Sequence, residues 1–175
     1  MVESIIARVA KLADAHALGA CGSNPLEVQV LSRAQFQRKR VMKSHFYHIQ
    51  INISFANLLF YKNLMDLLGW SIIFETGDTI GFKNEKSGDI WFVGTANLEA
   101  IDYDKKGMNH LAVRVEKSSD IDDVIAYLKK ADIQTLFETP RHRPEFTSDP
   151  KQTYYQVMFT SPDNVLFEIV YIGAK

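Results

Sequence analysis

The sequence contains a single cysteine, Cys21, among its 175 residues. One cysteine cannot form an internal disulfide, so the chain is unlike a secreted scaffold held by disulfides. No apolar run approaches the roughly 18 residues of a membrane span, and charged residues interrupt the N-terminal apolar positions, unlike a signal peptide. Its 20 basic and 21 acidic residues nearly balance, which argues against a general nucleic-acid-binding protein. We therefore expect a soluble, cytoplasmic protein with no nucleic-acid or membrane partner.

The composition, 46% hydrophobic and 23% charged, is that of an ordinary globular chain. Residues 1–43 are predicted as a helix followed by a connector. Apolar residues recur at helical spacing over residues 2–18, and breakers in Gly19–Pro25 end this pattern. The polar, basic stretch that follows is typical of a solvated connector.

Residues 44–95 are predicted to form a β-α-β-β-β module. Apolar and polar side chains alternate along Phe46–Ile53, as in a strand with one buried face. Apolar residues at helical spacing then predict a helix over residues 56–68, ended by Gly69. Turn residues divide the rest into three strands, at Trp70–Glu75, Thr79–Lys83 and Asp89–Gly94.

The same order of elements recurs in residues 107–173. A strand at Asn109–Val115 and a helix over residues 120–131 precede three strands, predicted at Ile133–Glu138, Tyr154–Thr160 and Val165–Tyr171. Asn164 suits the positive φ of the last hairpin turn. The repeat predicts an α+β fold in which two βαβββ modules form a cup-shaped mixed sheet, one composite domain over residues 44–173.

Polar residues lie on the strand faces that do not pack on the helices. These are His48, Gln50 and Asn52 in the first module, and His110 and Arg114 in the second. Glu168, inside the apolar strand VLFEIVY, would cost about several kcal/mol to bury without a partner. A cation shared with the two imidazoles would supply one, because these are ligand types for zinc, manganese, iron, nickel and cobalt. Ordinary hydrogen bonds, or pairing of Glu168 with Arg or Lys, would also explain these residues.

Four segments together resemble the vicinal oxygen chelate superfamily: YHIQINI, FYKNLMDLLGW, NHLAVRV and FTSPDNVLFEIVY. This superfamily includes glyoxalase I, bleomycin-resistance proteins, fosfomycin-resistance enzymes and extradiol dioxygenases. The resemblance covers residues 45–172 and leaves residues 1–40 outside. It implies one divalent metal ion (Zn, Ni, Mn, Fe or Co) held by His48, His110 and Glu168. It also implies a homodimer, because this family often pairs its modules between chains.

The sequence departs from the family in the first module. Glyoxalase I-like members usually carry a fourth ligand, Glu or Gln, at a position that falls near Phe92, and neither Phe92 nor Trp91 can bind a metal. We expect Phe92 to form an apolar wall of the cup instead. Gln50, Asn52 and Arg114 would then orient an anionic or carbonyl substrate. No residue is identified as a general base.

The function implied by the resemblance is that of a metal-dependent, glyoxalase-like lyase or isomerase, whose small substrate chelates the metal through oxygen atoms. One alternative is an iron(II) extradiol ring-cleaving dioxygenase. His142 and either Tyr154 or Tyr155 are then candidates for its additional histidine and tyrosine, and only one of these adjacent tyrosines can point into the cup. The other alternative is a metal-free binding protein of the bleomycin-resistance type, which works as a dimer and does not keep the metal ligands.

Overall fold

The structure, a computed structural model, describes residues 42–97 and 99–175. The helix predicted for residues 2–18 lies outside the described residues. The description below concerns the compact unit Ser44–Lys175. None of the described helices is both long enough and apolar enough to span a membrane.

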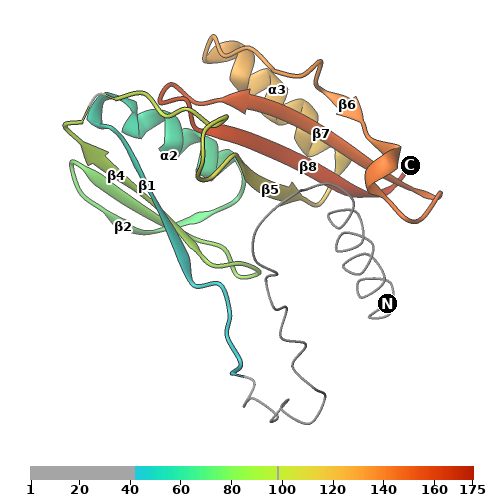
Figure 1. Ribbon diagram of the computed structural model, residues 1–175, viewed down its shortest axis with the longest axis horizontal. Helices are drawn as coiled ribbons and strands as arrows, with labels where there is room; N and C mark the ends of the chain where they lie inside the picture. Colours follow the sequence, from blue (N-terminus) through green and yellow to red (C-terminus); the bar gives the residue numbers. More distant parts are fainter. Residues whose placement is uncertain (1–41, 98) are drawn as a thin grey trace, which may run out of the picture. The chain divides into compact units, whose positions relative to one another are not determined.

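The first module contains one mixed sheet and one α-helix (Figure 1). Its elements are β1 (His48–Ser54), η2 (Phe55–Asn57), α2 (Leu58–Leu67), β2 (Ser71–Glu75), β3 (Thr79–Lys83) and β4 (Asp89–Thr95). The strand order is β1-β4-β3-β2, with β1 parallel to β4. As predicted, Gly69 follows the helix; its φ of 75° is a conformation that glycine adopts at no steric cost.

The second module repeats this arrangement. Its elements are β5 (Leu111–Val115), α3 (Ser118–Lys130), β6 (Arg141–His142), η3 (Pro144–Phe146), β7 (Gln152–Thr160) and β8 (Leu166–Ala174). The strand order is β5-β8-β7-β6, with β5 parallel to β8. Asn164, in the turn between β7 and β8, has the expected positive φ, 60°. The predicted fold class, an α+β fold of two βαβββ modules, is confirmed, and the eight strands form two four-stranded sheets.

One predicted strand is wrong. The segment Ile133–Glu138 forms only an isolated bridge, between Thr135 and Phe159, and the short strand β6 lies beyond it. Phe137 and Glu138 have φ values of 56° and 57°, which an extended strand does not allow. The segment therefore lies beside β7, where the backbone N–H of Leu136 donates to the carbonyl oxygen of Met158 at 2.7 Å, without continuing the sheet.

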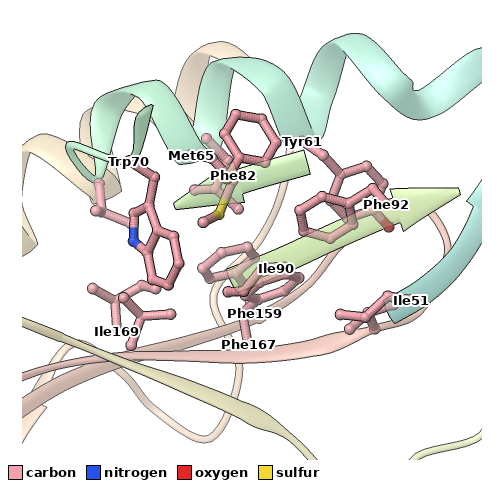
Figure 2. Packing of buried hydrophobic residues seen from close by; sticks show 14 of the residues in the cluster. Ile51, Tyr61, Met65, Trp70, Phe82, Ile90, Phe92, Phe159, Phe167 and Ile169 are labelled. Carbon is pink, nitrogen blue, oxygen red and sulfur yellow. The ribbon is translucent and has the colours of Figure 1, made fainter. Parts of the chain in front are cut away.

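A single hydrophobic core joins the two modules. Figure 2 shows Phe82 and Ile90 from the first sheet clustered with Phe159, Phe167 and Ile169 from the second, beneath helix α2. All five are 3% exposed or less. Each sheet therefore turns its inner face toward this common core, and its outer face points away from the core.

Two tyrosines add polar links between the modules. The Tyr61 hydroxyl is within hydrogen-bonding distance of Ser161 Oγ, 2.8 Å, and it donates to Asp163 Oδ2 at 2.7 Å. Tyr127 of α3 donates to the carbonyl oxygen of Phe60, 2.9 Å away. Burial raises the pKa of Tyr61 far above its usual value and that of Tyr127 to about 12. Both phenols therefore remain protonated donors at neutral pH.

Candidate metal site

His110 and Glu168 meet on the outer face of the second sheet. Glu168 lies opposite Ala112 in the parallel pairing of β8 with β5, and His110 precedes Ala112 by two positions, so both side chains emerge from the same face. Their atoms Nε2 and Oε2 are 3.2 Å apart, and the glutamate side chain is 7% exposed. Ligand atoms about 2.1 Å from a shared tetrahedral or octahedral ion lie about 3.0 to 3.4 Å apart. The pair therefore fits two ligands of one metal ion.

Asn109 orients the imidazole of His110. Its Nδ2 donates to the carbonyl oxygen of Tyr103 at 2.8 Å, which directs its Oδ1 toward His110 Nδ1, also at 2.8 Å. Because an amide oxygen only accepts, Nδ1 is the donor in this bond, and Nε2 is the nitrogen that faces Glu168. A cation between Nε2 and the carboxylate oxygen, either a proton on Nε2 or a metal ion, would attract both atoms. This arrangement of a metal-ligating histidine is common in proteins.

Tyr154 of β7 contacts the other oxygen of the same carboxylate. Its hydroxyl donates to Glu168 Oε1 at 2.7 Å. Burial, together with this bond to an acceptor, raises the pKa of Tyr154 well above its usual value. Tyr155, the next residue, stacks on His142 with the ring centroids 4.5 Å apart. As the alternation predicts, only Tyr154 of these two tyrosines faces the site.

Arg114 shares the outer face with Glu168. It lies opposite Val170, two pairs along the sheet from Ala112 and Glu168. Its side chain is exposed, and Nη2 donates to the carbonyl oxygen of Ile172 at 2.7 Å. This bond fixes one end of the guanidinium and leaves its other N–H groups for a ligand.

The outer face of the first sheet carries His48, Gln50 and Asn52. All three are exposed, and they alternate with Ile51 and Ile53, which point into the core. Gln50 Nε2 donates to Asn52 Oδ1 at 3.1 Å. The two amides therefore form a small polar row that keeps unused donor and acceptor atoms.

Phe92 does not line this face, which corrects the expectation that it forms a wall of the cup. It is fully buried under α2, and its ring stacks on Tyr61 with the centroids 4.3 Å apart. Trp91 takes the outward position and pairs with Gln50 in the register of β1 and β4. The indole lies over Gly81, where a Cβ atom would come within 2.9 Å of the ring. It also packs against the exposed ring of Phe74, with the centroids 5.6 Å apart.

His48 does not join His110 and Glu168 within the chain. Ile51 of β1 and Ile169 of β8 belong to the same core, so the opposite faces, with His48 and Glu168, both turn away from it. Across residues 42–97 and 99–175, no group of three or more His, Cys, Asp or Glu side chains is close enough to hold a metal. Within one chain, the expected three-ligand set is therefore reduced to the pair His110 and Glu168.

A cavity between the two modules does not include this pair. It has a volume of about 1560 Å³ and runs between the modules, lined by the end of α2, the turn between β3 and β4, strand β5 and the start of α3. The ion pair of Lys86 with Glu116 connects its two sides. Ala112 and Arg114 of β5 are among its lining residues, whereas His110 and Glu168 are not.

Two residues that matter at the site were not singled out from the sequence. Asn109 directly precedes His110, and an amide beside a strand histidine is a signal that could have been used. Trp91 was considered only as a side chain that cannot bind a metal, because the run Ile90–Val93 is apolar throughout and does not reveal which residues face outward.

No family model and no curated protein matches the sequence. Solved structures do match the fold. A candidate glyoxalase from Bacillus halodurans is 23% identical, with a TM-score of 0.59 over 72% of this chain and 94% of its own. A glyoxalase/dioxygenase from Nostoc punctiforme is 17% identical, with a TM-score of 0.56 over 88% of this chain and 99% of its own. The chain has the fold of the vicinal oxygen chelate proteins.

A fosfomycin resistance protein has the same fold. FosX from Listeria monocytogenes, crystallised with Mn(II) and sulfate, is 20% identical, with a TM-score of 0.52 over 74% of this chain and 91% of its own. These likenesses establish the architecture of the vicinal oxygen chelate fold in this chain.

Proposed function

We propose that this vicinal oxygen chelate protein is a divalent-metal-dependent enzyme. We assign it a lyase- or isomerase-like activity on a small substrate that binds the metal through oxygen atoms. The observation that carries the proposal is the geometry of His110 and Glu168. Asn109 bonds to Nδ1 and so turns Nε2 of the imidazole toward a nearly buried carboxylate oxygen 3.2 Å away, and a divalent cation would satisfy both groups.

The third ligand in this proposal is His48 of a second copy of the chain. The outer faces of the two sheets turn away from the common core, so one chain cannot bring His48 to its own Glu168. Two copies related by a two-fold axis would place the first sheet of each against the second sheet of the other, which forms two identical sites. Each site would then have two imidazoles, one carboxylate and open positions for substrate.

The remaining polar residues would bind and orient the substrate. A bound divalent ion would act as a Lewis acid and withdraw electron density from an oxygen of the substrate. Arg114 has free N–H groups for an anionic or carbonyl oxygen, while Gln50 and Asn52 supply an amide donor and an amide acceptor from the facing sheet. The Trp91 indole would form an apolar floor beside Gln50 and exclude water there.

The first test is metal binding by the purified full chain. Titration with Mn²⁺ or Zn²⁺ should show stoichiometric binding, and His110→Ala should weaken it about 100-fold or more, since even loss of a supporting residue typically costs 10- to 100-fold. His142→Ala is the matched control, because this histidine stacks on Tyr155 on the other face. Unchanged binding by His110→Ala would reject the ligand assignment.

The second test asks whether two chains share each site. His48→Ala and His110→Ala should each fail to bind metal alone. Mixing and refolding them together should restore about a quarter of the wild-type capacity, because half of the dimers are mixed and each of these has one intact site of two. If the refolded mixture binds no metal while the wild-type protein does, the sites are not shared between copies.

The bound metal and the reaction then distinguish the enzyme classes. Isomerisation of a hemithioacetal would support the glyoxalase-like assignment, whereas oxygen uptake with catechols by the iron-loaded protein would support a dioxygenase instead. Failure to bind any of Mn, Fe, Ni, Co or Zn would favour a metal-free binding protein and overturn the proposal.

A further inference from the structure

Tyr154 reaches Glu168 from a position that the strand pairing does not place next to it. In the register of β7 with β8, Met158 lies opposite Glu168, and Tyr154 lies opposite Ile172, four residues further along. The phenol nevertheless extends back along the sheet to donate to Glu168 Oε1 at 2.7 Å. A long side chain held over its neighbours in this way needs support from other parts of the module.

The segment around η3 supplies that support. The backbone N–H of Arg143 donates to the carbonyl oxygen of Tyr154 at 2.7 Å, which fixes the segment to β7. The Phe146 ring then packs against the Tyr154 ring in an edge-to-face arrangement, with the centroids 5.3 Å apart and the planes at 82°. The Arg143 guanidinium lies over the Phe146 ring, with its central carbon 4.6 Å from the ring centroid. Tyr154 is thus held in place from its outer side.

The two oxygens of the carboxylate consequently have different partners. Tyr154 occupies Oε1, and Oε2 faces His110 Nε2 at 3.2 Å. We propose that Tyr154 is a positioning residue that restricts Glu168 to binding the metal through Oε2 alone. This inference rests on the proposed function, and it adds a residue and a binding mode to it. Binding through one oxygen leaves one more coordination position for the substrate than binding through both.

The test compares Tyr154→Phe with Tyr155→Phe, two substitutions that each remove one hydroxyl from neighbouring residues of β7. Both full-length variants are titrated with Co²⁺, whose visible absorption spectrum reports the number and geometry of its ligands, and with Mn²⁺. Tyr154→Phe should weaken binding about 10- to 100-fold, as expected for loss of a group that orients a ligand, and should change the Co²⁺ spectrum. Tyr155→Phe should match the wild type in both measurements.

A second variant tests the same role without changing Tyr154 itself, in case Tyr154→Phe misfolds. Phe146 is 55% exposed, so Phe146→Ala should leave the fold intact while loosening Tyr154, with a smaller loss of affinity and a spectral change in the same direction. Suppose that the wild-type protein binds metal and His110→Ala does not. If Tyr154→Phe and Phe146→Ala then both keep the wild-type affinity and Co²⁺ spectrum, the positioning role is wrong and the proposed function stands. If the wild type binds no metal, both are overturned.

Discussion

The two modules share a topology and differ in what their outer faces carry. His48 and His110 take matching places in the two modules. His48 lies two residues before Gln50 and His110 two residues before Ala112, and each of these positions pairs with a residue at the centre of the outer face. In the second module that partner is Glu168. In the first module it is Trp91, and Gly81 stands beside it where Met158 stands beside Glu168.

This difference shows how one scaffold supports two kinds of surface. A buried carboxylate needs compensating groups, and Glu168 has a phenol on one oxygen and an imidazole near the other. An indole lying flat on a sheet needs space instead, and Gly81 provides it. Under the proposed function, the second module supplies two ligands of the ion, and the first module supplies the third ligand and the apolar floor.

The largest expected effect is the loss of metal affinity when Glu168 is changed, compared with a change at the matching residue Trp91. Glu168→Gln should weaken Mn²⁺ binding at least about 100-fold, because it removes a charged ligand that Tyr154 and His110 already surround. Trp91→Phe, at the corresponding position of the first module, should leave the affinity within about threefold. Both values follow from calorimetric titration.

An exposed glutamate provides the control for this pair. Glu116 is paired only with Lys86 among the described residues, so Glu116→Gln should bind metal like the wild type. A loss of affinity in Trp91→Phe comparable to that in Glu168→Gln would contradict the division between the two faces.

The next effect concerns the hydrogen bonds of Tyr61, which link the two modules. Tyr61→Phe should lower the free energy of unfolding by about 1–3 kcal/mol, because it leaves Ser161 and Asp163 without their buried partner. Urea denaturation measures this change. A variant as stable as the wild type would show that the Tyr61 hydroxyl does not help to join the modules.

A smaller effect should follow from filling the space under the indole. Gly81→Ala places a Cβ within 2.9 Å of the Trp91 ring, and we expect a loss of about 1 kcal/mol together with a changed tryptophan emission spectrum. Gly77→Ala is the control, because no atom lies within 4 Å of a Cβ at that position. Equal behaviour of the two variants would mean that Trp91 does not depend on Gly81.

The smallest expected effect is a dependence of stability on alkaline pH. Burial raises the pKa of Tyr127 from its ordinary value of 10.0 to about 12 in the folded state. Folding therefore gains stability from the neutral phenol below pH 10, and this contribution is lost as the pH rises toward 12. Tyr127→Phe should reduce the difference between urea midpoints measured at pH 8 and pH 11, and an undiminished difference would argue against this role.

The fold could be predicted largely from local patterns. Alternation and helical spacing are set by neighbouring residues, and they predicted both modules and the turn at Asn164. The segment Ile133–Glu138 was predicted wrongly because its apolar residues suit a strand, whereas the chain makes only one bridge to β7 and then turns with positive φ values at Phe137 and Glu138.

The site could be predicted only in part, for a physical reason. Alternation along β8 and before β5 is enough to predict that Glu168 and His110 share a face. The relation of His48 to them depends on how two sheets share one core, which no periodicity within a module encodes. Phe92 and Trp91 are both large and apolar, so only the packing of Tyr61 against Phe92 decides which one points inward.

The common core also constrains how such a chain can be divided. Cutting the connector between β4 and β5 would leave each half with an inner face of exposed aromatic and aliphatic side chains. Neither half would be a stable protein by itself, yet the two fragments retain complementary surfaces and should reassociate when mixed. The repeated halves are thus separate units of pattern but a single unit of folding.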